Sequence, residues 1–154
     1  MSLHFSDREM QGAWKNNFLA YKIVQTPCTN AHRLLLFYSI ECGLKATLMK
    51  RESVKTTKDC VSLIALIKGS GNDGHDINKL LDALSAGRDL KLPPEINMTS
   101  SQRVGCGEIN QMWRYGGKVA NIKNQKGDLV GSPDEYLENC LLRISEWIKQ
   151  ELQP

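Results

Sequence analysis

The segment from Ala31 to Arg51 has the spacing of a helix but is apolar around more than one side. Its apolar side chains include Leu34, Leu35, Phe37, Tyr38, Cys42, Leu44, Ala46, Leu48 and Met49. A helix with one face in water keeps a polar stripe, so this helix is expected to be covered by other elements. Thr29 or Asn30 can cap its start. The sequence therefore predicts a central helix around which the rest of the chain packs.

Two further long helices have clear start signals. Ser6 and Glu9 have the spacing of a capping box, and apolar residues follow at helical spacing up to about Gln25, where Pro27 disfavours further helix. Ser132 and Glu135 form a second such pair around Pro133, which suits the first helical position. The apolar residues that follow Pro133, at intervals of three and four, predict a helix to the C-terminal region.

The remaining segments are shorter. The run from Val61 to Ile67 fits either a short helix or a buried strand, and we favour a helix capped by Asp59 or Thr57. A helix is expected from His75-Asp76 to about Gly87, and another over 108–115. Residues 118–131 form either a small hairpin or a loop. We therefore expect one domain, 1–154, with an all-α fold: an up-and-down helical bundle of about five helices.

Composition limits the functional classes. The chain has 154 residues, of which 41% are hydrophobic and 24% charged, as in ordinary soluble proteins. A net charge of +3 neither demands nor excludes a nucleic-acid partner. The five cysteines include no C-x-x-C pair, which argues against a zinc site and for a reducing, cytoplasmic location. The longest apolar stretch, Leu34 to Tyr38, is far too short to cross a membrane. No metal and no cofactor are expected.

Histidines limit the catalytic options, because the chain has only His4, His32 and His75. No established catalytic motif surrounds them. The segment Gly74-His75-Asp76-Ile77 has two interpretations. In the structural one, which the spacing favours, Asp76 caps the helix and His75 packs; in the functional one, His75 lies beside free N–H groups where a phosphate binds.

The segment from Met112 to Lys118 is the densest polar and aromatic one. Trp113 and Tyr115 offer stacking faces, while Arg114 and Lys118 offer cations for phosphate. The alternative is that Trp113 lies in the core, that Arg114 pairs with a buried acid, and that the glycines only turn the chain.

Three segments together resemble the HEPN family, the higher eukaryotes and prokaryotes nucleotide-binding helical domains. Residues 38–46 (YSIECGLKA) resemble the central helix of that family, in which a Glu and a Lys interrupt small and apolar residues. Residues 74–77 (GHDI) are similar to its T-H-D-L helix start, and residues 113–116 (WRYG) to its A-R-Y-P segment. The order and rough spacing agree over about Ala31 to Trp147.

The resemblance implies a helical bundle that forms a homodimer and a cleft shared by Glu41, Lys45, His75, Arg114 and Tyr115. With Asp76 and Lys118 from the two polar segments, these are the expected ligand-binding residues. Glu41 and Lys45 also have the spacing of an ordinary surface ion pair.

The ribonucleases of this family use an Arg and a His about four to six residues apart on a late helix, and Arg114 is followed by no histidine. We therefore expect no catalytic residues, and a non-catalytic module that binds a nucleotide, RNA or a partner protein in a bacterial toxin–antitoxin or defence context. One alternative is a diverged, metal-independent ribonuclease in which His75 and Arg114 meet in space. The other is an antitoxin or immunity-type protein that recognises a cognate protein partner.

Overall fold

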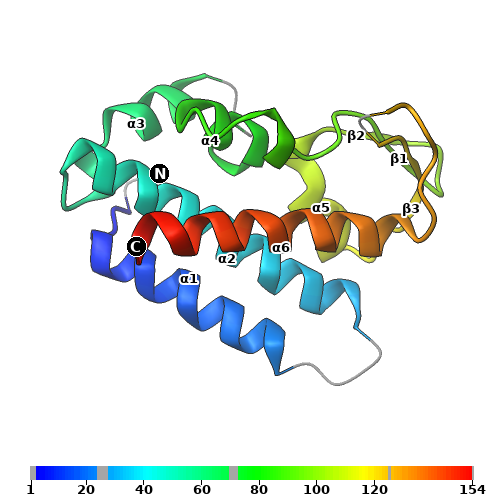
Figure 1. Cartoon of the computed structure of the whole chain (residues 1–154), viewed down its shortest axis with the longest axis horizontal. Coiled ribbons are helices and arrows are strands. Elements are labelled where there is room, and N and C mark those ends of the chain that lie inside the picture. The colour runs from blue at the N-terminus through cyan, green and yellow to red at the C-terminus, as the bar shows by residue number, and fades with distance from the viewer. Residues whose placement is uncertain (1–2, 24–27, 70–72, 125, 154) are drawn as a thin grey trace.

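Three long helices form the framework of the molecule. The computed structural model describes residues 3–23, 28–69, 73–124 and 126–153. Helix α2 (Asn30–Glu52) lies between α1 (Asp7–Lys22) and α6 (Pro133–Leu152); α1 runs antiparallel to α2, and α6 runs in the direction of α2 (Figure 1). Most of α2 is buried, with Leu36, Phe37, Ile40 and Leu44 fully inaccessible to solvent. The predicted central helix is confirmed.

The start of α1 follows its sequence signal. The Glu9 N–H donates to Ser6 Oγ at 3.1 Å, and the Ser6 N–H donates to Glu9 Oε1 at 3.0 Å. These two bonds satisfy N–H groups that the first helical turn leaves without partners. The helix ends at Lys22, earlier than expected, with Ile23 as its C-cap. The expected end at Gln25 lies outside the described residues.

Helix α6 begins at Pro133 as predicted, but its capping box does not form. Ser132 has φ 48°, in the left-handed region, and its side chain makes no capping bond. The Ser6 cap, in contrast, has an extended backbone, which aims the side chain at the third helical N–H. The same residue pattern therefore gives two different helix starts.

Two shorter helices pack over the other side of α2. Helix α3 (Val61–Lys68) confirms the helical interpretation, but the expected caps are wrong, because Thr57–Asp59 form a separate 3₁₀ turn and Cys60 is the N-cap. The Glu52 carboxylate accepts from the Val61 N–H at 2.7 Å and from the Ser62 N–H at 3.1 Å. The side chain that caps the first turn of α3 therefore comes from the end of α2. Helix α4 (Ile77–Ala83) begins at its Asp76 cap and ends before Gly87.

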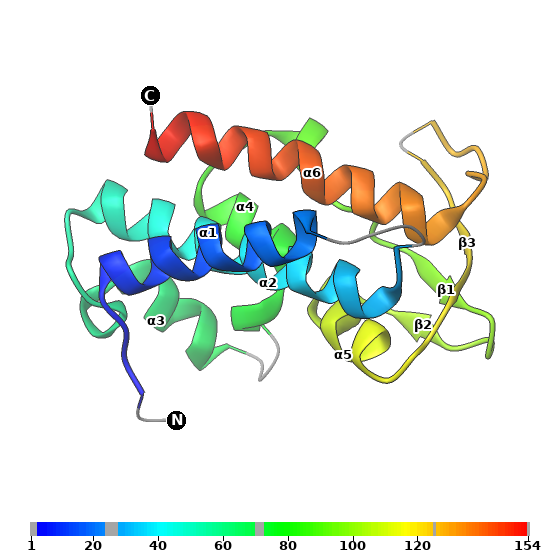
Figure 2. The same ribbon diagram turned by 90° about the horizontal axis from the view of Figure 1, so that it is seen from below.

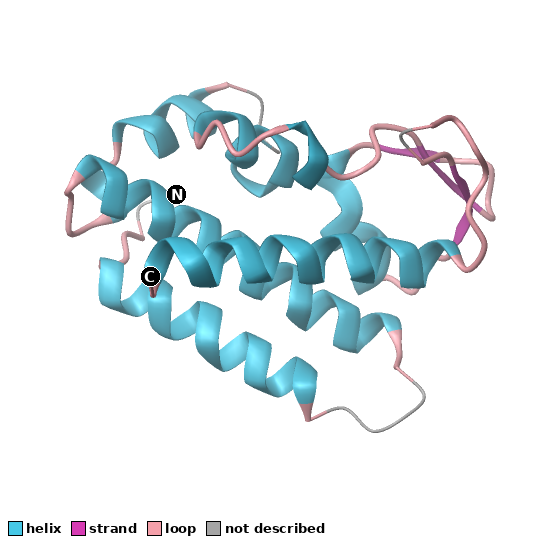
Figure 3. Cartoon of the chain, in the orientation of Figure 1, coloured by secondary structure: helices cyan, strands magenta, loops and turns pink. Residues whose placement is uncertain are grey.

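A small sheet corrects the all-α prediction. Strands β1 (Ile96–Met98), β2 (Arg103–Val104) and β3 (Val119–Ile122) form an antiparallel sheet in the order β2-β1-β3, at one end of the helices (Figure 3). Ile96 pairs with both Val104 and Ile122, and all three side chains are buried. Strands this short pair only weakly by themselves, and the burial of these apolar side chains stabilises the sheet.

Residues 118–131 therefore supply one strand of a sheet rather than an independent hairpin or a loop alone. After β3 the chain does turn back on itself, since Lys123 forms an antiparallel bridge with Leu129 and the Asn124 N–H donates to the Asp128 carbonyl at 2.8 Å. Gln125, at this turn, lies outside the described residues. The predicted helix over 108–115 is confirmed as α5 (Ile109–Arg114).

The architecture is thus mostly helical, with six α-helices among the described residues. Within those residues, no helix combines the length and the apolar character that crossing a bilayer would require.

Candidate functional site

One side of α2 presents three polar side chains. Tyr38, Glu41 and Lys45 follow one another at intervals of three and four residues, so they lie on the same face of the helix. We call these three residues the α2 stripe. The segments on either side of the stripe come from distant parts of the chain: the 3₁₀ turn Asp73–His75 and α5, which both lie on the side of α2 opposite α6 (Figure 2).

Glu41 is the centre of this arrangement. Its residue is only 8% exposed, and its carboxylate has two partners: Lys45 Nζ donates to Oε2 at 3.1 Å, and His75 Nδ1 lies 2.9 Å from Oε1. Burial is the largest single influence and by itself raises the pKa of Glu41, but the His75 hydrogen bond and the Lys45 charge together outweigh it. The pKa of Glu41 is therefore lowered, and its side chain is a carboxylate at neutral pH.

His75 is oriented by this contact. A carboxylate can only accept hydrogen bonds, so Nδ1 of His75 is the protonated ring nitrogen in the pair. The side chain is 47% exposed, and none of the hydrogen bonds among the described residues involves its Nε2. The bond to Glu41 thus fixes the tautomer and leaves Nε2 as the ring nitrogen available to a ligand.

Arg114 reaches the other end of the stripe. It is the last residue of α5, its side chain is exposed, and its guanidinium donates to the Tyr38 hydroxyl. Hydrogen bonds to Tyr38 and to Tyr115 raise the pKa of Arg114 above its usual value. Tyr38 and Glu41 are one helical turn apart, about 4.5 Å along the axis, so Arg114 and His75 meet adjacent positions of the same face.

The two glycines after Arg114 are required by the backbone turn and by close packing. Gly116 ends α5 with φ 76°, and a Cβ atom at Gly117 would lie 2.4 Å from Met98 Cε and 2.9 Å from Met112 Cγ. Tyr115 is 78% exposed beside Arg114. Lys118 is exposed but lies beyond this turn, just before β3, and none of its contacts places it at the α2 stripe.

Two neighbouring residues have the structural roles considered for them. Asp76 caps α4, with its Oδ1 accepting from the Lys79 N–H at 3.1 Å. Trp113 is 2% exposed in the core, and its Nε1 donates to Asp134 Oδ1 at 2.9 Å. The alternative in which Arg114 pairs with a buried acid is wrong, because its partners are the hydroxyl groups of Tyr38 and Tyr115.

The structure therefore brings together four of the seven predicted ligand-binding residues, Glu41, Lys45, His75 and Arg114, with Tyr115 next to Arg114. Sequence reasoning missed Tyr38 as the residue that holds Arg114. Its spacing of three from Glu41, on the same helix, was the signal that could have found it.

The cysteine next to Glu41 is not an activated nucleophile. Burial, with a smaller contribution from the Glu41 charge, raises the pKa of Cys42 to about 11. Among the side chains that the structure describes, no group of three or more His, Cys, Asp or Glu residues is placed to hold a metal ion.

Comparison of the chain with protein-family models, with curated proteins and with solved structures finds no match.

Proposed function

We propose that this protein is a non-catalytic HEPN-like module that binds RNA or a nucleotide through its phosphates at the α2 stripe. The observation that supports the proposal is the convergence of Arg114 and His75, from distant segments, on adjacent turns of α2. Their meeting on one face is what a shared binding surface requires.

Arg114 is the principal phosphate contact in this proposal. A guanidinium can donate two parallel hydrogen bonds to a phosphate, and the bond to Tyr38 holds the Arg114 group in place before a ligand arrives. The exposed ring of Tyr115 offers a stacking face for a base. Lys45 contributes less, because the Glu41 carboxylate already neutralises it.

The test is the affinity for a fluorescein-labelled single-stranded RNA, measured by anisotropy. Replacing Arg114 with Ala removes a charge-assisted contact of about 1.5–3 kcal/mol, which corresponds to an affinity about ten- to a hundredfold weaker. Arg8→Ala, an exposed arginine on α1, is the matched control and should bind RNA as the unmodified protein does. Equal affinity of both variants would remove Arg114 from the site.

A diverged ribonuclease is the second candidate, favoured by the Glu41–His75 contact. A carboxylate that orients one ring nitrogen and leaves the other free is the usual support for a histidine that transfers protons. In this alternative His75 Nε2 would transfer a proton, and Arg114 would stabilise the charge that develops on the phosphate. Metal-free cleavage of RNA, abolished in His75→Ala, would establish it; RNA that stays intact with both proteins would end it.

The homodimer implied by the resemblance is part of the same proposal. Its test is the molar mass in solution by light scattering coupled to gel filtration.

A core-buried Arg114 would favour the alternative of an antitoxin or immunity-type interaction protein, but the Arg114 side chain is exposed.

A further inference from the structure

A second group of cations surrounds a cavity on the α6 side of the molecule. The cavity has a volume of about 550 Å³ and lies between α4, the first turn of α6 and the segments 88–94 and 123–124. Arg88, Lys91 and Lys123 contribute the cations, and Tyr136 contributes an aromatic ring. Because α5 and the turn with His75 lie on the other side of α2, this cavity is separate from the α2 stripe (Figure 2).

The charges of this cavity favour an anion. None of its lining residues is a carboxylate. Lys91 forms an ion pair with the exposed Asp82, which partly neutralises it. Lys123 is exposed, and among the described residues no ion pair or hydrogen bond engages its ammonium group. With Arg88 on the same cavity, an anion that entered would meet cations from two different segments.

The wall of the cavity is formed before any ligand arrives. The Asn78 amide accepts from the Leu92 N–H at 2.7 Å and donates to the Leu92 carbonyl at 2.9 Å. These two bonds attach the segment 88–94 to α4, and Leu92 and Pro93 are buried behind it. Tyr136 is half-buried against the core, so packing limits the positions of its ring. A pre-organised wall lowers the entropy that binding must offset.

We propose that this cavity binds a nucleotide, with the phosphates on Lys123 and Arg88 and the flat base against the ring of Tyr136. A volume of about 550 Å³ lies within the range of pockets that hold small ligands. The proposal does not depend on the α2 stripe, because the two sites share no residue.

Isothermal titration calorimetry with each of the four nucleoside diphosphates tests the proposal. The unmodified protein should bind at least one of them, and Lys123→Ala should weaken that binding about tenfold or more by removing a phosphate contact. Lys123 is exposed, so thermal unfolding should show the variant folded as stably as the parent. Tyr136→Leu, which keeps an apolar group but removes the ring, should weaken the diphosphate and leave pyrophosphate binding unchanged.

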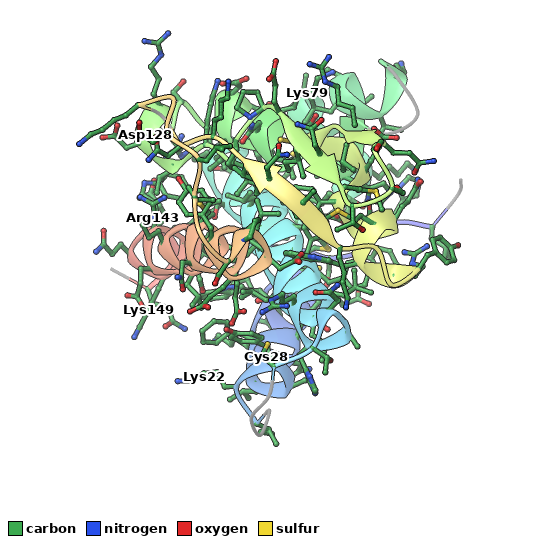
Figure 4. All side chains as sticks on the ribbon, turned by 90° about the vertical axis from the view of Figure 1, so that its right-hand side faces the viewer. Lys22, Cys28, Lys79, Asp128, Arg143 and Lys149 are labelled. Carbon is green, nitrogen blue, oxygen red and sulfur yellow. The ribbon has the colours of Figure 1, made fainter. Side chains whose placement is uncertain are left out.

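Lys149→Ala is the matched control. Lys149 lies 13 residues beyond Tyr136 on α6, about 20 Å along the helix axis (labelled in Figure 4). This variant should bind the diphosphate as the parent does. Failure of all four diphosphates to bind, or equal binding by Lys123→Ala and Lys149→Ala, would overturn the proposal. Arg114→Ala should leave the part of diphosphate binding that depends on Lys123 intact, so failure of the α2 site and failure of this one can be told apart.

Discussion

Two glycines in the long helices should respond in opposite ways to the same substitution. Gly43 lies where α1 and α6 approach α2: a Cβ atom there would be 2.8 Å from Trp14 Cδ1 and 2.9 Å from Ile148 Cδ1. Around Gly12, in α1, a Cβ atom would have no heavy atom within 4 Å other than those of its chain neighbours and its own helix backbone. Ala stabilises a helix interior by about 1 kcal/mol relative to Gly, whereas overpacking a core costs about 1–3 kcal/mol. Gly12→Ala should therefore stabilise the protein by about 1 kcal/mol, and Gly43→Ala should lie about 1–3 kcal/mol below it.

Urea unfolding followed by circular dichroism measures both free energies of unfolding. In thermal unfolding the difference should separate the two midpoints by several degrees, since 1 kcal/mol shifts Tm by about 2–4 °C in a protein of this size. Equal stabilisation by the two substitutions would mean that Gly43 has room for a methyl group. The close approach of α1 and α6 to α2, on which the description of the fold rests, would then be wrong.

Three further substitutions test polar contacts of the fold. Glu41→Gln should lower the free energy of unfolding by about 1.5–3 kcal/mol at pH 7. Because the pKa of Glu41 is lowered in the folded protein, the stability it contributes is present above its usual pKa and is lost as pH falls through the lowered value, so urea unfolding near pH 3 should show a smaller difference. Asp134→Ala should cost about 1–3 kcal/mol by leaving the buried Trp113 Nε1 without its acceptor, and an unchanged urea midpoint would contradict this bond. Asp76→Ala should cost about 1 kcal/mol and speed amide hydrogen exchange in the first turn of α4; exchange at the original rate would remove Asp76 as the cap.

The helices could be predicted because each is specified by residues close together in the sequence. Ser6 and Glu9 form the capping box at the start of α1, and the apolar pattern of α2 predicts its central position. The start of α3 could not be predicted in the same way. Its N–H groups bond to Glu52, which lies outside the segment and reaches it only after the chain has turned.

The sheet could not be predicted from the local pattern of polar and apolar residues. Strands β1 and β2 are three and two residues long, too short to show an alternation of polar and apolar side chains. Ile96 is buried between Val104 and Ile122, its partners on either side, and only the tertiary fold brings those three together. The sequence showed the apolar residues around 119–130 but not the strand with which they pair.

The candidate site was predictable as a set of residue types rather than as an arrangement. The Glu41–Lys45 contact follows from spacing within one helix. The contact of His75 with Glu41 joins residues 34 apart in the sequence. The contact of Arg114 with Tyr38 joins residues 76 apart. Only the fold places these contacts on one side of α2. The same fold leaves Asp76 as a helix cap and Lys118 beyond the turn that ends α5.

The most direct test of the proposed binding surface is an NMR titration of the ¹⁵N-labelled protein with a short single-stranded RNA. Binding at the α2 stripe should move the amide signals of Tyr38 to Lys45, His75, Arg114 and Tyr115 progressively and saturably, while the signals of α1 stay in place. An RNA that moves none of these signals, or that moves only signals elsewhere, would contradict the assignment of this surface as the binding site.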